Sequence, residues 1–197
     1  MTTAAAARFP VLTELLWRDR GLGRSATLAL VGSLALALSA KVQVPFWPVP
    51  TTMQSLVVLL IGITYGSRLG AATVLLYLAE GLAGLPVFAG ATAGPAYMAG
   101  PTGGYLLGFL IGTACTGRLA ERGWDRTLGR AATAMALGHV LLFVPGVLWL
   151  AFLFGWPKAV AFGITPFLVA TAIKTALGAA LVAVFWSRVG GRLSDRA

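Results

Sequence analysis

A lysine inside an apolar segment is the side chain of this sequence best suited to hold an anion. Lys174 lies near the middle of the apolar run 163–186, where a charged lysine costs about 2.5–3.5 kcal/mol if it is left in hydrocarbon. Two carboxylates are candidates to neutralise it: that of Glu80, in the outer part of another apolar run, and that of a bound substrate. Thr171 lies one helical turn before the lysine and adds a hydroxyl to the same face. The pattern indicates an anion-binding point and leaves both partners open.

A proline-rich stretch, "VQVPFWPVPTTMQS" at 42–55, interrupts the apolar runs. Prolines restrict the backbone and lower the entropy lost when a loop holds one shape, so we expect a stiff cap. Trp47 has two interpretations, as an aromatic anchor at the membrane interface or as a ring that covers a ligand. Gln54 also has two, because Thr51 and Gln54 have the spacing of a helix capping box and the Gln54 amide equally suits a ligand contact.

A second irregular stretch, 80–108, is rich in glycine and proline. Such a segment cannot stay helical throughout, and glycine lets the backbone approach closely and adopt positive φ. We expect a compact loop folded over a pocket, with Phe88, Tyr97 and Tyr105 as its large side chains. The stretch is not a nucleotide-binding P-loop, because no Gly-Lys pair followed by Ser or Thr occurs in the sequence.

Catalytic and metal-binding side chains do not cluster along the sequence. The motifs G-x-S-x-G and H-E-x-x-H are absent. His139 and Cys115 are isolated in apolar helical runs, where a packing role is typical. We therefore expect no catalytic residue, no metal site, no cofactor and no enzyme activity.

The composition indicates an all-α integral membrane protein. Hydrophobic residues make up 58% of the 197 residues and charged residues 11%, far from the average of soluble proteins. A membrane-spanning helix needs about 20 mostly apolar residues, and six runs qualify: about 25–43, 53–67, 69–85, 103–119, 131–154 and 163–186. Only Gly66, Ser67 and Arg68 separate the second run from the third.

The basic residues predict the orientation of these spans. With six spans the loops alternate between two sides, and one side receives only Lys41 and Lys158. The other side receives twelve arginines: Arg8, Arg18, Arg20, Arg24, Arg68, Arg118, Arg122, Arg126, Arg130, Arg188, Arg192 and Arg196. By the positive-inside rule both termini are cytoplasmic and the irregular loops are outside, capping a ligand pocket. The net charge of +9 is thus explained without a nucleic-acid partner.

The chain is expected to form a single membrane domain, 1–197. It divides into a cytoplasmic or interfacial segment, 1–23, a six-helix bundle, 24–186, and a cytoplasmic tail, 187–197. In the first segment, apolar residues at helical spacing between Val11 and Leu16 predict a short helix lying in the membrane interface. No cleavable signal peptide is visible there.

Small residues recur at every fourth position of the first span, at Ser25, Ala29, Ser33 and Ala37. Such a stripe lets another helix approach closely. It is compatible with packing inside the protein and with docking of a partner subunit, and we take it as the candidate docking face.

Several motifs together resemble one family. The stretches "VPFWPVPTTMQSLVVLLIG", "YLAEGLAGLPVFAG", "GPTGGYLLGF" and "LAERGWDR" are similar, in order and over nearly the whole chain, to the BioY family, the biotin-specific S components of energy-coupling-factor (ECF) transporters. The resemblance implies a six-helix protein of the bacterial cytoplasmic (inner) membrane that binds biotin from outside. It also implies a transmembrane T component and two ATPase subunits as partners.

The sequence departs from the family near the sixth span. Such proteins typically read Pro-Phe-Leu-x-Gly-Asp-x-x-Lys, whereas this chain reads "PFLVATAIK" from Pro166 to Lys174. The role of binding the biotin carboxylate carries over to Lys174, while Thr171 replaces the family aspartate.

The remaining biotin contacts follow from the chemistry of the ligand. We expect Trp47, Phe88 and Tyr97 to cover the biotin rings, Gln54 to pair with the ureido group, and Glu80 to neutralise Lys174 in the empty protein. An S component for another small vitamin, or a stand-alone facilitator, is the alternative.

Overall fold

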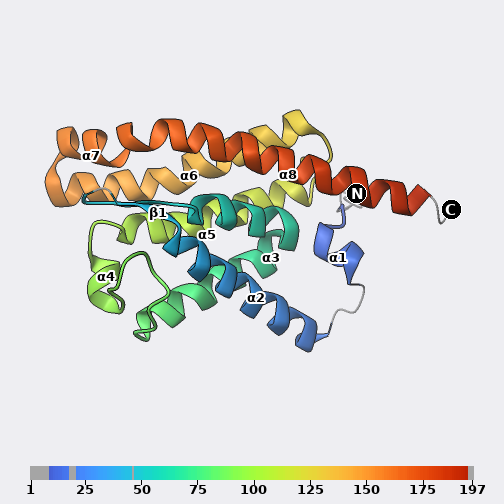
Figure 1. Ribbon diagram of the computed structural model, residues 1–197, viewed down its shortest axis with the longest axis horizontal. Coiled ribbons are helices and arrows are strands. Elements are labelled where there is room, and N and C mark those ends of the chain that lie inside the picture. Colours follow the sequence, from blue (N-terminus) through green and yellow to red (C-terminus); the bar gives the residue numbers. More distant parts are fainter. Residues whose placement is uncertain (1–8, 18–20, 46, 195–197) are drawn as a thin grey trace, which may run out of the picture.

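The computed structural model describes residues 9–17, 21–45 and 47–194, and most of this part is helical (Figure 1). The helices are α1 (Leu12–Leu16), α2 (Leu22–Lys41), α3 (Gln54–Leu82), α4 (Pro95–Ala99), α5 (Gly103–Ala120), α6 (Leu128–Phe154), α7 (Trp156–Gly163), a short 3-10 helix η1 (Thr165–Phe167) and α8 (Leu168–Ser194). Between α2 and α3, strands β1 (Gln43–Val44) and β2 (Thr51–Thr52) pair antiparallel.

Helix α3 is bent at Gly66, whose φ of 81° and ψ of 175° divide it into two halves. A residue with a Cβ is strained at this φ, so glycine suits the position. Across the bend, the side chain of Glu121 accepts hydrogen bonds from the amide and the hydroxyl of Ser67 at 2.8 and 3.0 Å. These bonds satisfy donors at the start of the second half, as a capping residue would. The bend falls at the boundary expected between the second and third apolar runs.

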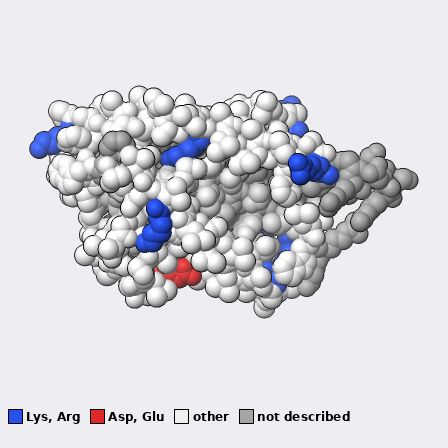
Figure 2. Space-filling view, viewed as in Figure 1, with Lys and Arg blue, Asp and Glu red and all other residues white. Residues whose placement is uncertain are grey.

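Four helical stretches of the described residues are long and apolar enough to cross a membrane: α2, α3, α6 and Trp156–Arg188, which contains most of α8. Helices of this length and composition are typical of an integral membrane protein. The count differs from the six runs expected because α3 is continuous across its bend and because α5 is not among the four. Large aliphatic side chains are exposed along α2 and α8, and most of the face drawn in Figure 2 is uncharged.

The helices pack in chain order: α2 against α3, α3 against α5, α5 against α6, and α6 against α8. Glycines allow the closest crossings. A Cβ at Gly62 would overlap Thr113 of α5, and a Cβ at Gly108 would overlap the backbone of Leu142 in α6. Backbones that approach this closely gain van der Waals contact, which drives helix association where water is absent.

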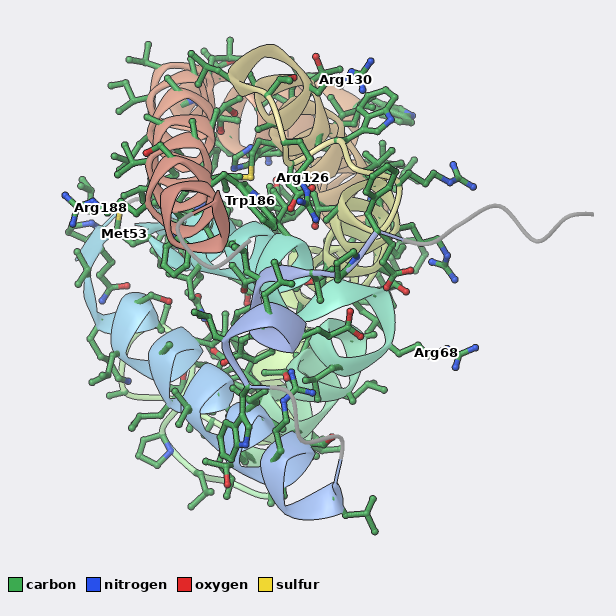
Figure 3. The ribbon with its side chains drawn as sticks, turned by 90° about the vertical axis from the view of Figure 1, so that its right-hand side faces the viewer. Met53, Arg68, Arg126, Arg130, Trp186 and Arg188 are labelled. Atoms are coloured by element: carbon green, nitrogen blue, oxygen red, sulfur yellow. The ribbon has the colours of Figure 1, made fainter. Side chains whose placement is uncertain are left out.

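The bundle has two distinct ends (Figure 1). The loop end holds the β1–β2 loop, α4 and α7, and the arginine end holds α1, the α5–α6 loop 121–127 and the C-terminal part of α8. Figure 3 shows Arg68, Arg130 and Arg188 extending away from the bundle at the arginine end, while Arg126 lies within it beside Trp186.

Residues of the motif "LAERGWDR" hold the arginine end together. The Arg126 guanidinium lies 3.5 Å from the ring centroid of Trp186 and donates to the Pro10 carbonyl oxygen at 2.7 Å. The Trp186 indole nitrogen donates to the buried carboxylate of Asp125 at 2.8 Å. Burial raises the pKa of Asp125 above its ordinary value, against the opposing effect of Arg126.

Helix α1 is a short helix, as predicted, but it packs on the bundle as well. Val11 and Leu12 are fully buried, and the Thr13 hydroxyl donates to the Thr64 carbonyl oxygen of α3 at 3.0 Å. Residues 11–13 of the first segment are therefore packed against the helices, and residues 1–8 and 18–20 of that segment lie outside the described part of the chain.

Candidate ligand-binding site

A cavity at the loop end collects the polar and aromatic side chains that suit a small ligand. Its volume is about 50 Å³. Its polar lining is Thr52, Gln54, Ser55, Thr102, Thr171 and Lys174; its aromatic lining is Tyr97, Tyr105, Phe109, Phe143 and Phe167; Val49, Pro50, Ala89, Leu106 and Leu142 complete it. Four of the seven predicted ligand residues meet here: Gln54, Tyr97, Thr171 and Lys174.

Lys174 projects from α8 toward the start of α3 and is 7% exposed. Its ammonium donates to the Thr52 carbonyl oxygen at 2.6 Å and to the Ser55 hydroxyl at 3.2 Å. Both partners are neutral, so they accept hydrogen bonds from the ammonium without cancelling its charge. A positive charge thus remains at the cavity wall, where an anionic group of a ligand would neutralise it.

The predicted ion pair between Glu80 and Lys174 is wrong. The Glu80 carboxylate instead accepts a hydrogen bond from the Ser33 hydroxyl of α2, and Glu80 does not line the cavity. The reason is geometric: α2 packs against the second half of α3, which carries Glu80, whereas Lys174 contacts Ser55 in the first turn of α3.

Gln54 is the first residue of α3 and is buried. The predicted capping box with Thr51 is wrong, because Met53 is the N-cap and the Thr51 hydroxyl has no hydrogen-bond partner. Thr52 caps this end of α3 instead. Its hydroxyl accepts a hydrogen bond from the backbone nitrogen of Gln54 at 3.3 Å and donates to the side-chain carbonyl oxygen of Gln54 at 3.3 Å. The Gln54 side chain also lines the cavity.

Two of the predicted ring contacts occupy different places. Tyr97 lines the cavity, but Phe88 is fully buried behind it, stacked on Tyr97 with ring centroids 4.8 Å apart. Phe88 sits over Gly81, where an added Cβ would overlap its ring. Phe88 therefore supports Tyr97 and does not contact the cavity. Burial raises the pKa of Tyr97, so its hydroxyl stays neutral.

Trp47 lies outside the cavity and is 76% exposed. Its ring lies near Phe154 and Phe162, with centroids 6.2 and 6.0 Å away. Of its two interpretations, the arrangement favours the exposed aromatic anchor. Val49 and Pro50 of the same loop cover the cavity instead.

The predicted docking stripe on α2 faces the protein at its centre. Ser33 is 2% exposed and bonded to Glu80, and Ala37 packs against the hydrophobic core. Ser25 and Ala29 are half-buried. The exposed face of α2 carries Leu30, Leu34 and Leu38, so the small residues Ser33 and Ala37 serve packing within the chain.

Sequence reasoning missed the hydroxyls of Thr52 and Ser55 and the rings of Phe143 and Phe167. Ser55 follows Gln54 directly, so a signal was present. Phe167 belongs to "PFLVATAIK", seven residues before Lys174 and two helical turns away on one face, which is also a usable signal. Among the described residues no group of three or more His, Cys, Asp or Glu is placed to hold a metal ion.

A larger groove, about 820 Å³, runs along the outer surface between α6 and α8. Its lining is apolar apart from His139, Thr171 and Thr175, and the His139 ring hydrogen-bonds the Thr175 hydroxyl at 3.0 Å. Without a charged side chain, it lacks the anion-binding point that the cavity has.

Comparison with known proteins identifies the family. The sequence profile of the BioY family matches residues 11–191. The chain belongs to the BioY family. Similar BioY proteins include the probable biotin transporter BioY of Pyrococcus horikoshii, 37% identical over 140 residues that cover 71% of this chain and 82% of that protein. Biotin transporter BioY2 of Lactococcus lactis subsp. cremoris is 37% identical over 158 residues, covering 78% of this chain and 85% of that protein.

The BioY assignment agrees with a solved structure. The crystal structure of the S-component for biotin from an ECF-type ABC transporter matches with a TM-score of 0.71 over 84% of this chain and 92% of that chain. The two sequences are 22% identical, so the match establishes a shared fold.

Proposed function

We propose that this chain binds biotin and acts as the substrate-specific S component of an ECF-type transporter in the bacterial cytoplasmic membrane. The similar proteins of Pyrococcus horikoshii and Lactococcus lactis carry the names of biotin transporters, and the matched crystal structure is that of a biotin S-component. The family assignment thus supports biotin as the ligand and uptake as the role.

The observation that carries the proposal is the buried ammonium of Lys174 at the wall of an aromatic cavity. Biotin combines a compact bicyclic ring system with a tail that ends in a carboxylate. Lys174 would neutralise the carboxylate with a charge-assisted hydrogen bond. Tyr97, Phe143 and Phe167 would bury the rings, with a gain of about 25 cal/mol for each Å² of apolar surface removed from water.

The cavity must widen to admit such a ligand. Its volume of about 50 Å³ is below the roughly 300–1,000 Å³ of typical small-molecule sites. The segments that cover it, around Val49, Pro50 and Ala89, belong to loops. We infer that these loops move apart for entry and close over bound biotin.

The topology completes the proposal. Counting the two halves of α3 separately, α2, α3, α5, α6 and α8 provide six spans. The arginine end would face the cytoplasm with both termini, by the positive-inside rule. The loop end, with the cavity, would then open to the outside, where the vitamin is captured.

Concentrative uptake would require a partner motor, because the sequence contains no P-loop motif. A T component and two ATPase subunits would supply it. The Ser33–Ala37 part of α2 packs inside the chain, so their contacts would lie on other surfaces.

Uptake of radiolabelled biotin tests the role. Cells that lack biotin transport would express the chain alone or together with T and ATPase subunits. The proposal predicts accumulation with the complete set and a loss of accumulation in Lys174→Met. Uptake without accumulation, equal with and without the partners, would indicate a stand-alone facilitator, and no uptake with any subunit set would contradict the proposal.

A further inference from the structure

A chain of buried hydrogen bonds links the cavity to the loop that follows α3. The Gln54 side-chain nitrogen, Nε2, lies 2.6 Å from the Tyr77 hydroxyl oxygen, and that oxygen lies 3.0 Å from the carbonyl oxygen of Val87. Tyr77 is fully buried and Gln54 nearly so. These hydrogen bonds thus join the start of α3, the second half of α3 and the 83–94 loop.

The direction of each hydrogen bond in this chain is fixed by chemistry. A carbonyl oxygen can only accept, so the Tyr77 hydroxyl must donate its single proton to Val87. The Tyr77 oxygen then accepts from Gln54, which requires the NH2 group of the amide to point at Tyr77. With the opposite amide orientation, either two acceptors would lie 2.6 Å apart in a buried site, or the Tyr77 proton would turn to Gln54 and leave the Val87 oxygen without it. Each alternative loses one buried hydrogen bond.

The other end of the Gln54 amide therefore belongs to the cavity. Tyr77 does not line the cavity, whereas Thr52 does, and the Gln54 Oε1 atom lies on the Thr52 side, 3.3 Å from its hydroxyl. A carbonyl oxygen has two lone pairs, and Thr52 takes one of them. The remaining lone pair is an acceptor for a ligand N–H group.

The loop that sets this orientation is itself held firmly. The Lys41 ammonium donates to the carbonyl oxygens of Phe88 and Gly90 at 2.8 and 3.0 Å. The Gly94 amide donates to the Gly81 carbonyl oxygen at 2.8 Å. The Val87 acceptor is therefore fixed in place, and it fixes the direction of the hydrogen bonds from Gln54 to Tyr77 and from Tyr77 to Val87.

We propose that Tyr77 is a positioning residue that orients Gln54, so that its carbonyl oxygen accepts an N–H of the ligand and selects ligands with a ureido-type donor. This inference rests on the proposed binding of biotin, whose ureido group carries two N–H donors. Tyr77 itself touches no ligand. Because Tyr77 donates to the fixed carbonyl of Val87, it holds the Gln54 amide with its carbonyl oxygen toward the cavity.

Selectivity between two ligands tests this role. The dissociation constants of biotin and of a biotin analogue methylated on both ureido nitrogens would be measured on purified protein, and their ratio compared among variants. In Tyr77→Phe the amide can rotate and offer its NH2 group, so the preference for biotin should fall toward the ratio found in Gln54→Ala. Biotin binding itself should weaken about 2- to 13-fold, the effect of one ordinary hydrogen bond.

Two references make the result specific. The Gln54→Ala ratio measures the steric effect of the methyl groups alone. Tyr65→Phe removes the hydroxyl of another α3 tyrosine that does not line the cavity, and it should leave the ratio unchanged. If Tyr77→Phe weakens both ligands equally, Tyr77 only stabilises the loop and the inference is wrong.

Gln54→Glu provides a second test that does not require Tyr77→Phe to fold. A carboxylate at position 54 has two acceptor oxygens and no donor. One oxygen would take the Tyr77 proton in place of Val87 and the other would still accept an N–H in the cavity, so the preference for biotin should persist. A variant that binds the methylated analogue as well as biotin would overturn the inference. Absence of biotin binding by the wild-type protein would instead contradict the proposed function, and the inference with it.

Discussion

Replacing Lys174 with methionine should remove the contribution of the biotin carboxylate to the binding affinity and leave that of the rest of the ligand. Methionine keeps an apolar stem of similar length and removes the ammonium, which donates to Thr52 and Ser55 at 2.6 and 3.2 Å and is 7% exposed. A hydrogen bond to a charged group contributes about 1.5–3 kcal/mol. Since about 1.4 kcal/mol corresponds to a tenfold change in affinity, biotin should bind roughly 10- to 150-fold more weakly.

The assay compares an acid with its neutral counterpart. Radiolabelled biotin would be displaced from purified protein by unlabelled biotin or by biotin amide, which lacks the negative charge. Lys174→Met should bind biotin roughly 10- to 150-fold more weakly but the amide less than about threefold more weakly, since only the acid forms the charge-assisted hydrogen bond. Lys158→Met, an exposed lysine of α7 outside the cavity lining, is the matched control. Equal losses for acid and amide would refute the carboxylate role.

Three further predictions test the loop end and the arginine end. Trp47→Ala should change the dissociation constant of biotin less than about twofold, because Trp47 is exposed outside the cavity; a loss of binding would place its ring on the ligand. Gly81→Ala should lower stability by roughly 1–3 kcal/mol through overlap with the buried Phe88 ring, whereas Gly129→Ala, with open space around it, should not; equal thermal shifts would contradict this. Burial raises the pKa of Asp125, so the folded state retains a proton that the unfolded state loses, and stability due to this group falls as pH rises above about 3.8. Melting temperatures of Asp125→Asn should lack this component, and an identical pH profile in the variant would show that the carboxyl is not the cause.

The helices were predictable because long apolar runs have few alternatives. The bend at Gly66 was also visible, as a short polar interruption between two runs. Helix α4 was missed because its five residues lie inside a glycine-rich stretch, where Pro95 at its first turn is a weak local signal. The number of spans depends on whether a bent helix is read as one element or two.

The cavity was predictable where one residue carries the signal by itself. Lys174 is a charge inside an apolar run, and Gln54 and Tyr97 are distinctive side chains in loop-flanking positions. Trp47 and Phe88 do not line the cavity, because the path of a loop decides which of its rings face inward. The Phe88 ring instead packs against Gly81, which has no side chain to block it.

The partners of polar side chains were the least predictable feature. Glu80 is bonded to Ser33 through the packing of α2 on α3, a contact that no spacing rule gives. Tyr77 was missed for the same reason, since its role depends on three groups from separate segments meeting in one buried place.

Equilibrium binding of radiolabelled biotin to the purified protein, without any partner subunit, tests the central claim most directly. We predict saturable binding of one biotin per chain, displaced by unlabelled biotin and not by other vitamins at the same concentration. Absence of saturable biotin binding by folded protein, or equal displacement by another vitamin, would contradict the claim.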